Sequence, residues 1–579
     1  MKSFIQLDDV SFSYQENQDP NSTVLTNLSF SINEGEFVAL IGQNGSGKST
    51  LGKLLNALLI PDTGNVFIEG MNTRESANHP VIRSRVGMVF QRPQDQIVAT
   101  TVVEDVAFGP GNLGLPSKEI RQRVDEALEL TGLAACRGRP SYLLSAGETQ
   151  RVALAGVLAM RPKCVIFDET TAILDSSGRD MVMSQAKVLN NNGITIIFIT
   201  HLMEESVQAK RVLVLHQGQL VMDATPAEVF SSSSRIRSFG LDLPPAALAA
   251  RSLKSYFPSL PDNILFEGEL LNELPKYSGM SKLAEPNNRS EKVWEPCIEV
   301  EDLSHVYLRG TPLAHQALEK CNLKAGFGAA SGLIGSTGSG KSTLLQHLNG
   351  LILPQSGKVN VLGHALNDPE TDIKALRRLV GLAFQQPEDQ IFEQYVGDEI
   401  AFAARNFAIP GKIADIVRSA MQAVGLDFET FKDRLTSTLS GGERRKVALA
   451  SVLASQPQVL LLDEPLAGLD PLSRNEIIGH LEKLKKKGIT LVISTHQFED
   501  IVELMDKISV LDHGRDMAHG TPGQIFSNEK YLEEAGIKPP LVARIVNKLR
   551  KSGWPLPAEI VSIKDLETSL SSILSGAEG

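Results

Sequence analysis

The sequence predicts an α/β fold in which one type of domain, built around a mostly parallel sheet, occurs twice. Three observations lead to this prediction. A short apolar run ends at a glycine-rich loop in each half of the chain, at 42–50 and at 335–343. A helical pattern of leucines follows each loop. Other segments recur in both halves about 295 positions apart, a period too long for a solenoid unit. We therefore expect a tandem duplication of a whole domain.

The elements around each loop can be predicted in chain order. The run 37–41 is expected to be a buried strand, and the leucines after the loop predict a helix that Pro61 ends, as Pro354 does in the second half. These leucines are Leu51, Leu54, Leu55 and Leu58 in the first half and Leu344, Leu345, Leu348 and Leu351 in the second. Further strands of a largely parallel sheet, with helices on both faces, are predicted at 165–167, 196–199, 459–462 and 491–493.

The repeat covers nearly the whole chain, so both halves are expected to divide in the same way. The main domains are predicted at 1–230 and 297–526, each followed by a small C-terminal region, at 231–275 and 527–579. The stretch 276–296 is polar, lacks periodicity and contains proline and glycine, which predicts a linker.

Composition narrows the classes of protein that remain. The net charge of −11 argues against a protein that binds nucleic acid, which would show a basic footprint. No apolar run reaches the roughly 18 residues needed to cross a bilayer, and the acidic start is not expected to be a signal peptide. The cysteines lack C-x-x-C spacing and are expected to be reduced and mostly buried. They are Cys136, Cys164, Cys297 and Cys321.

Both glycine-rich loops fit the pattern G-x-x-x-x-G-K-[ST], which binds the phosphates of a nucleotide. The glycines let backbone N–H groups surround the phosphates, the lysine reaches the terminal ones, and the next hydroxyl holds Mg²⁺. We therefore predict ATP and Mg²⁺ at both loops, with Ser49 and Ser342 as metal ligands. The loop residues are Gly42, Gln43, Asn44, Gly45, Ser46, Gly47, Lys48, Ser49 and Thr50, and Gly335, Ser336, Thr337, Gly338, Ser339, Gly340, Lys341, Ser342 and Thr343.

A pair of carboxylates ends an apolar run in each half. The first residue of such a pair can hold Mg²⁺ and the second can deprotonate an attacking water. A histidine lies 32 positions after the second carboxylate in both halves and can bridge the γ-phosphate to it. We predict Asp168 and Asp463 as metal ligands, and Glu169, His201, Glu464 and His496 as catalytic residues.

Two further positions complete each predicted site. Gln91 and Gln385 each follow a phenylalanine, and an amide there can contact Mg²⁺ and the attacking water. Serine and small residues precede helices expected to begin near 151 and 444, where a hydroxyl, free N–H groups and the helix dipole form an anion site. Their sequences are Leu144-Ser145-Ala146-Gly147-Glu148 and Leu439-Ser440-Gly441-Gly442-Glu443.

This combination of motifs resembles the nucleotide-binding subunits of ABC transporters, whose signature is an LSGGE-like segment. The resemblance covers both halves. It implies ATPase domains of the P-loop class, each with a helical subdomain, and an internal pseudo-dimer in which each ATP lies between one half's loop and the other half's signature. At one ATP site, Ser440 and Gly442 would face a set made up of Lys48, Asp168, Glu169 and His201. At the other site, Ser145 and Gly147 would face Lys341, Asp463, Glu464 and His496. Tyr14 and Tyr307 match the family's adenine-stacking aromatic, or else are simple strand-edge tyrosines.

The two halves depart differently from the family pattern. The first signature has Ala146 where the second has Gly441. The family favours proline and glycine where the first half has Thr170 and Ile173, and a β-branched residue restricts the backbone more than glycine does. Both sets keep their glutamate and histidine, so we expect unequal turnover at the two sites.

Both halves also share the motif Q-x-P-x-D-Q-I, at 91–97 and 385–391, followed by acidic-aromatic segments at 104–108 and 398–402. These resemble the ATPases of energy-coupling-factor importers, which handle cobalt, nickel and vitamins; the fused form resembles the type assigned to thiamine or its hydroxymethylpyrimidine precursor. The resemblance implies an integral membrane coupling protein, a separate membrane substrate-binding protein, and a peripheral location at the cytoplasmic face of the cell membrane. The acidic pairs are expected to receive arginines of the coupling protein.

Three alternatives belong to other classes. Twin ABC proteins without a membrane span also act on ribosomes, but they typically have a basic character and a long charged helical linker. A DNA-repair ATPase would show zinc spacing or an inserted coiled coil. A nucleotide-sensing scaffold would not need two complete hydrolytic sets. Membrane fractionation with and without partner subunits would separate these alternatives.

Overall fold

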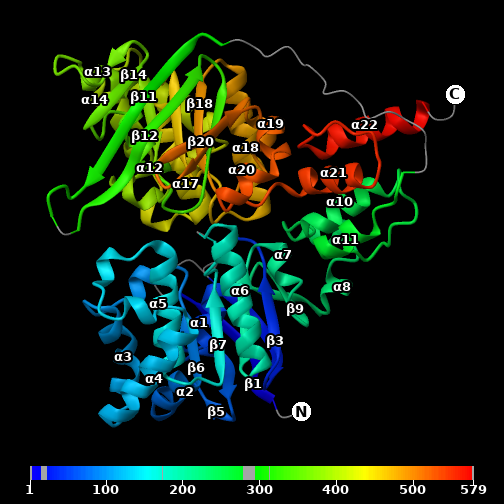
Figure 1. Cartoon of the computed structure of the whole chain (residues 1–579). Helices are drawn as coiled ribbons and strands as arrows, with labels where there is room; N and C mark the ends of the chain where they lie inside the picture. Colours follow the sequence, from blue (N-terminus) through cyan, green and yellow to red (C-terminus); the bar gives the residue numbers. More distant parts are fainter. Residues whose placement is uncertain (1–2, 15–22, 173, 278–293, 312, 577–579) are drawn as a thin grey trace. The chain divides into compact units, whose positions relative to one another are not determined.

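The computed structural model describes residues 3–14, 23–172, 174–277, 294–311 and 313–576, coloured along the chain in Figure 1. The described chain forms two compact units, 1–247 and 248–579, and each is treated by itself here. Most of the predicted linker lies outside the described residues.

The larger sheet of the first unit confirms the predicted parallel strands. Its strands are β3 (Phe37–Ile41), β6 (Val86–Val89), β7 (Cys164–Asp168), β8 (Thr195–Thr200), β9 (Arg211–His216) and β10 (Gln219–Ala224). Their order is β10-β9-β3-β8-β7-β6, and only the pair β9 and β10 is antiparallel. Strands β3, β7 and β8 are buried along their whole length, as expected when both faces of a parallel sheet are covered.

A smaller antiparallel sheet lies at the start of the first unit. It contains β1 (Ser3–Ser13), β2 (Thr23–Asn33), β4 (Thr63–Ile68) and β5 (Met71–Asn72), in the order β2-β1-β4-β5. Its apolar side chains join those of the larger sheet and of helix α1 (Lys48–Leu55) in one core. The glycine loop therefore begins on a strand and ends on a helix that are both anchored in this core.

Helices form a separate layer of the first unit. They include α3 (Val102–Asn112), α4 (Ser117–Leu130) and α5 (Ala146–Ala159). These helices pack together through one buried apolar cluster, to which they contribute Val106, Leu128 and Val152 respectively. This is the helical subdomain that the resemblance implied. The remaining helices are α2 (His79–Arg85), α6 (Ser176–Asn191), α7 (Met203–Ser206), α8 (Pro226–Val229) and α9 (Ser233–Ser238).

The second unit repeats this architecture. Its sheets are ordered β12-β11-β14-β15 and β16-β17-β18-β13-β19-β20, the second parallel except for β19 with β20. The strands are β11 (Pro296–Tyr307), β12 (His315–Gly326), β13 (Ala330–Ile334), β14 (Ser356–Val361), β15 (His364–Ala365), β16 (Val380–Ala383), β17 (Val459–Asp463), β18 (Thr490–Thr495), β19 (Lys507–Asp512) and β20 (Arg515–Gly520). The helices are α12 (Lys341–Leu348), α13 (Ile373–Leu379), α14 (Val396–Asn406), α15 (Ile413–Ala423), α16 (Phe428–Phe431), α17 (Gly441–Leu453), α18 (Pro471–Lys486), α19 (Pro522–Ser527) and α20 (Glu529–Glu534).

The end of the first half packs onto the end of the second half, inside the second unit. Figure 1 shows α11 (Glu267–Glu273) beside α21 (Leu541–Lys551), and α10 (Pro245–Leu253) and α22 (Ile563–Gly576) lie in the same region. Trp554 is 5% exposed, its ring lies 5.1 Å from that of Phe257 and 5.0 Å from that of Tyr277, and its Nε1 donates to the Pro275 carbonyl at 2.9 Å. Long-range packing thus joins 248–277 to the chain's last helices.

Four predicted helix boundaries are wrong, for identifiable reasons. The loop helices end at Leu55 and Leu348, because Ala57 and Gly350 turn the backbone to a positive φ (56° and 68°) and the next N–H bonds back to close the helix. The leucines beyond these turns, Leu58 and Leu351, are exposed (41% and 47%). The signature helices start earlier than predicted, since the signature serines are their N-caps.

Two compositional predictions can be compared with the structure. No helix in the described ranges has the length and apolar character needed to cross a bilayer. All four cysteines are free; Cys164, Cys297 and Cys321 are buried and Cys136 is half-buried, which confirms the prediction for the thiols.

Candidate functional site

The first glycine loop joins strand β3 to helix α1. Gly45 and Gly47 adopt positive φ (81° and 98°), and a Cβ on Gly47 would approach the Leu25 Cδ2 to 2.5 Å, so glycine is required there. The Lys48 ammonium donates to the carbonyls of Gly42 at 2.9 Å and Gln43 at 2.8 Å. These two hydrogen bonds fix the Lys48 ammonium against the backbone of its own loop.

The second glycine loop has the same geometry. Gly338 and Gly340 have φ of 84° and 100°. The Lys341 ammonium donates to the carbonyls of Gly335 and Ser336, both at 2.8 Å. The two loops that were predicted from a short pattern therefore have nearly the same shape.

The first loop offers unfilled hydrogen-bonding capacity that fits a triphosphate. Helix α1 begins after Gly47 without a side-chain cap, so its first N–H groups are available to an anion. The Ser46 hydroxyl is buried and has no hydrogen-bond partner among the described residues. Donors that are sheltered from water in this way require an acceptor, and phosphate oxygens meet that requirement.

A hydroxyl and a carboxylate meet at the expected metal position of each half. The Ser49 hydroxyl donates to Asp168 Oδ1 at 2.8 Å, and Ser342 bonds to Asp463 in the same way. Burial raises the pKa of Asp168 to about 6 and raises that of Asp463. Both carboxylates lie at the ends of strands, and an oxygen-only pair of this kind fits Mg²⁺.

The first group of residues predicted to be catalytic is centred on Glu169, the residue after β7. The Gln91 amide donates to its Oε2 at 3.0 Å, Lys48 Nζ lies 3.6 Å from Oε1, and His201 Nδ1 lies 3.6 Å from Oε2. Burial opposes ionisation, but His201 and Lys48 outweigh it and hold the pKa of Glu169 at about 2. The structure therefore brings together the four residues predicted from separate motifs.

The second catalytic group is tighter around its histidine. His496 Nδ1 lies 2.7 Å from Glu464 Oε1, and the His496 backbone N–H donates to the same oxygen at 3.0 Å. Burial again opposes ionisation, and His496 outweighs it and lowers the pKa of Glu464. Glu169 and Glu464 both adopt a φ of 47°, a strained backbone that the surrounding sheet must hold.

The remaining predicted residues lie beside the glycine-loop helices or at the N-termini of α5 and α17. The hydroxyls of Tyr14 and Tyr307 hydrogen-bond Thr50 and Thr343 of the loop helices, each at 3.2 Å. Tyr14 is 44% exposed and Tyr307 is 36% exposed. Ser145 and Ser440 cap α5 and α17 in capping boxes, and Gly147 and Gly442 lie in the first turns of these helices.

The positions where the halves differ are partly described. A Cβ on Gly441 would meet open space within its own unit, and Gly468 adopts a positive φ of 70° that suits glycine. Ile173, which occupies the matching position in the first half, lies outside the described residues, as does the side chain of Ala146. Thr170 is buried at the end of the catalytic segment.

The acidic pairs expected to bind arginines do not act as pairs. Asp105 and Glu399 are 7% and 2% exposed, and each accepts two backbone N–H groups of the preceding loop. The prediction is therefore wrong for these two residues, which fix the loop instead. Glu104 and Asp398 remain accessible.

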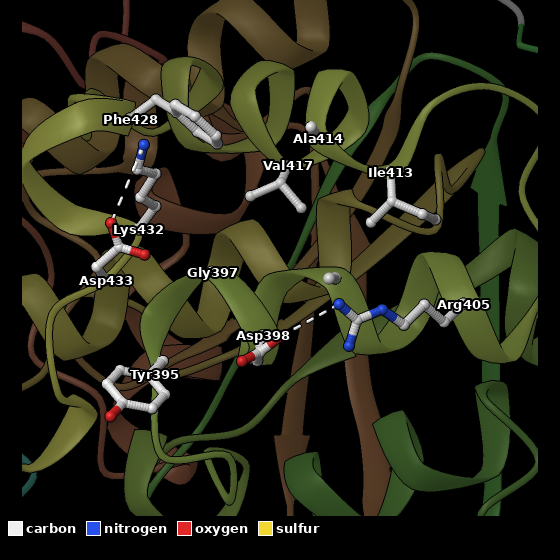
Figure 2. Close-up of a pocket in the computed structure, with 11 residues that line it drawn as sticks. Tyr395, Gly397, Asp398, Arg405, Ile413, Ala414, Val417, Phe428, Lys432 and Asp433 are labelled. Carbon is white, nitrogen blue, oxygen red and sulfur yellow. Dashed lines mark hydrogen bonds and ion pairs between the residues drawn. The ribbon is translucent and has the colours of Figure 1, made fainter.

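Asp398 lines a pocket of the second helical layer, shown in Figure 2. It faces Arg405 at 3.1 Å, and Lys432 also lines this pocket. The pocket holds about 420 Å³. Charged groups of both signs and apolar side chains such as Val417 and Phe428 thus meet in one accessible hollow.

Sequence reasoning missed a half-buried arginine beside the second site. Arg445 Nη1 donates to the Glu464 carbonyl at 2.6 Å, and Nη2 donates to the Gln385 carbonyl at 3.0 Å. Burial lowers the pKa of this guanidinium to about 10. The available signal was a charge difference between the halves, since Gln150 occupies the matching position of the first signature helix.

Comparison with known proteins agrees with this geometry. The family model described as ABC transporter matches residues 25–172 and 318–467. A "Putative ABC transporter ATP-binding protein" of Methanosarcina acetivorans is 32% identical over 98% of this chain and 93% of its own. The energy-coupling factor transporter ATP-binding protein EcfA1 of Symbiobacterium thermophilum is 51% identical over 47% of this chain and 96% of its own. The structure of cbiO1 from Clostridium perfringens, part of the ABC transporter complex cbiONQ, is 34% identical over 41% of this chain and 94% of that chain, with a TM-score of 0.37.

The family match covers the two glycine loops and ends just after Glu169 and Glu464, the two glutamates predicted to be catalytic. The relative from Methanosarcina acetivorans extends the likeness through both units. The chain therefore belongs to the ABC transporter family, as an ATP-binding, ATP-hydrolysing protein with two ABC domains.

Proposed function

We propose that this chain is the ATPase subunit of an energy-coupling-factor importer. It is proposed to work at the cytoplasmic face of the cell membrane as a peripheral protein, with an integral membrane coupling protein and a separate membrane substrate-binding protein. The observation that carries the proposal is a complete lysine, carboxylate and histidine set in both halves of one chain. The high identity of a single half to a protein named as an energy-coupling-factor ATPase supports the importer type.

The chain's own residues account for hydrolysis. Lys48 and Lys341, which hold loop carbonyls in this structure, would exchange them for terminal phosphate oxygens. Ser49 with Asp168, and Ser342 with Asp463, would hold Mg²⁺, which neutralises phosphate charge when bound. Glu169 and Glu464 are kept ionised and can take a proton from water, while His201 and His496 orient these carboxylates.

The two halves are proposed to form a pseudo-dimer around two ATP molecules. Ser440 and Gly442 would contact the ATP held by Lys48, and Ser145 and Gly147 the ATP held by Lys341. The N-termini of the signature helices support this role, because the serine hydroxyl and the first-turn N–H groups that the capping box does not use can face an anion. Closure on ATP and opening after hydrolysis would move the membrane partner.

Docking of the coupling protein is proposed to use the accessible carboxylates Glu104 and Asp398. An arginine of the partner would replace Arg405 beside Asp398; this ion pair is about half exposed on both sides, so little energy opposes the exchange. The test is purification of a tagged chain from membranes. Asp398→Arg combined with Glu104→Arg should remove membrane proteins from the purified material while ATP binding is retained. Asp415→Arg, at an exposed position of α15, is the control and should leave both co-purification and ATP binding unchanged. Unaltered co-purification in the double variant would contradict this docking site.

The substrate is proposed to be a vitamin, a vitamin precursor such as hydroxymethylpyrimidine or thiamine itself, or a transition-metal ion. Uptake of labelled thiamine, hydroxymethylpyrimidine, Co²⁺ and Ni²⁺ should be measured in cells with the wild-type chain and with Glu169→Gln combined with Glu464→Gln. ATP-dependent loss of uptake for one compound identifies it. Sedimentation of the chain with ribosomes rather than membranes would instead support the ribosomal alternative.

A further inference from the structure

The signature helix of the second half is tied to its own catalytic residues from inside the protein. Arg445 lies in the second turn of α17, five residues after its N-cap Ser440. Its guanidinium donates to the backbone carbonyls of Glu464, at the end of β17, and of Gln385, just after β16. One half-buried side chain thus connects three segments that each contribute a predicted site residue.

A second contact reinforces this link. The Gln390 amide donates to the Ala448 carbonyl at 2.7 Å and to the Ser451 hydroxyl at 3.0 Å, both in α17, while its oxygen accepts the Phe384 N–H at 3.2 Å. Arg444 of α17 also donates to Glu388 Oε1 at 2.6 Å, so the loop that carries Gln385 is bonded to α17 through Gln385, Glu388 and Gln390.

The first half makes neither link in this way. Gln150 stands in place of Arg445, and its buried Oε1 has no hydrogen-bond partner in the described ranges. Gln96, the counterpart of Gln390, donates to the Met88 carbonyl at 3.2 Å, on β6 rather than on the signature helix. Gln91 here bonds Glu169 directly. The two halves hold their glutamine loops by different contacts.

We infer that Arg445 is a positioning residue for ATP hydrolysis by the second half. It fixes the strained backbone of Glu464 and the backbone of Gln385 against α17, so that carboxylate and amide keep their places relative to the signature helix. Hydrogen bonds from a charged donor are stronger than neutral ones and impose direction. This inference rests on the proposed catalytic role of Glu464.

The test uses the full-length chain carrying Glu169→Gln, so that hydrolysis depends on Glu464. Arg445→Gln, which copies the first half, should lower kcat roughly 10- to 100-fold, because small displacements of reacting groups cost rate of this size. The KM for ATP should stay within about threefold, because Lys341 donates to the carbonyls of its own loop, at Gly335 and Ser336, whereas Arg445 donates to those of Glu464 and Gln385. Arg445→Lys keeps one charged donor and should recover part of kcat. Arg418→Gln makes the same charge change at an exposed position of α15. This variant is the control and should leave kcat unchanged.

The outcomes separate this inference from the proposed function. If Glu464→Gln in the same background leaves hydrolysis intact, the role of Glu464 is wrong. If Glu464→Gln abolishes hydrolysis but Arg445→Gln keeps kcat within about twofold of its parent, the positioning role is wrong. Should Arg445→Gln fail to fold, Arg445→Lys decides: a kcat reduced about threefold or more supports the role, and an unchanged kcat overturns it.

Discussion

Helix α12 follows the second glycine loop, and we expect two buried histidines, His347 and His305, to lower its stability in acid. The first half of the chain serves as an internal control. His347 lies on α12 with 0% exposure, its Nδ1 is 2.7 Å from the Thr343 carbonyl, and its ring is 4.9 Å from that of His305 on β11. The matching residues of the first half, Leu54 and Phe12, cannot titrate. The perturbation we consider is His347→Leu, which copies the first half.

The magnitude follows from the pKa. Burial, together with the neighbouring His305, lowers the pKa of His347 from 6.5 to about 4, and the Thr343 carbonyl opposes this only in part. As the pH falls, His347 therefore takes up a proton at a lower pH in the folded state than in the locally unfolded state. Stability is fully present above pH 6.5 and is lost as the pH falls toward 4. The loss is about 2 kcal/mol at pH 5 and approaches about 3.4 kcal/mol below both pKa values. Burial also lowers the pKa of His305, which adds a loss of the same sign.

The assay is hydrogen exchange of α12 and α1 in the same chain at pH 7.5 and pH 5, after correction for intrinsic rates. Protection of α12 should fall about 30-fold more than protection of α1, which is the ratio that corresponds to about 2 kcal/mol. His347→Leu should remove most of this difference. Equal changes in α1 and α12, or an undiminished acid loss in His347→Leu, would refute the reasoning.

Three further predictions concern the two sites and the C-terminal packing. Glu464→Gln should reduce ATP turnover more than Glu169→Gln, because the second carboxylate has the closer histidine; rates of the two single variants check this, and equal losses would refute unequal sites. Gly47→Ala should abolish ATP binding at the first loop, so that fluorescent-ATP titrations show one bound nucleotide instead of two, and should lower the melting temperature, since φ is 98° and the new methyl meets a leucine; Gly111→Ala, with open space around it, is the control. Trp554→Ala should cost about 3–5 kcal/mol of local stability. Its measure is exchange protection of α11 and α21, and protection lost equally throughout the unit would contradict a local packing role.

The predicted site residues were found from sequence because their requirements are local. A backbone that must wrap a phosphate needs glycine at fixed positions, and Gly45 and Gly47 have the positive φ that this demands. The carboxylates could be predicted because each ends a continuous apolar run, and such runs are strands of a buried parallel sheet. Repetition in both halves distinguished these residues from chance occurrences.

Other features could not be predicted, because they depend on which atoms are buried together. The sequence pattern of Asp105 and Glu399 is that of surface acids, but both are buried and accept N–H groups of the loops that precede their own helices. The left-handed backbone of Glu169 and Glu464 has no sequence signal, since it is imposed by the sheet around it. The sequence shows only that Arg445 replaces the Gln150 of the first half. The tertiary structure is needed to show that its guanidinium donates to two backbone carbonyls.

The sequence by itself determined that two nucleotide-binding α/β domains follow one another and which side chains gather around each phosphate loop, because glycine spacing and apolar periodicity act over a few residues. Tertiary structure alone decided how tightly each glutamate is held by its histidine, how the two glutamine loops are anchored, and that residues 248–277 pack with the chain's last helices. These properties arise from contacts between segments far apart in the chain, such as Trp554 with Pro275, 279 positions away, and no local pattern encodes them.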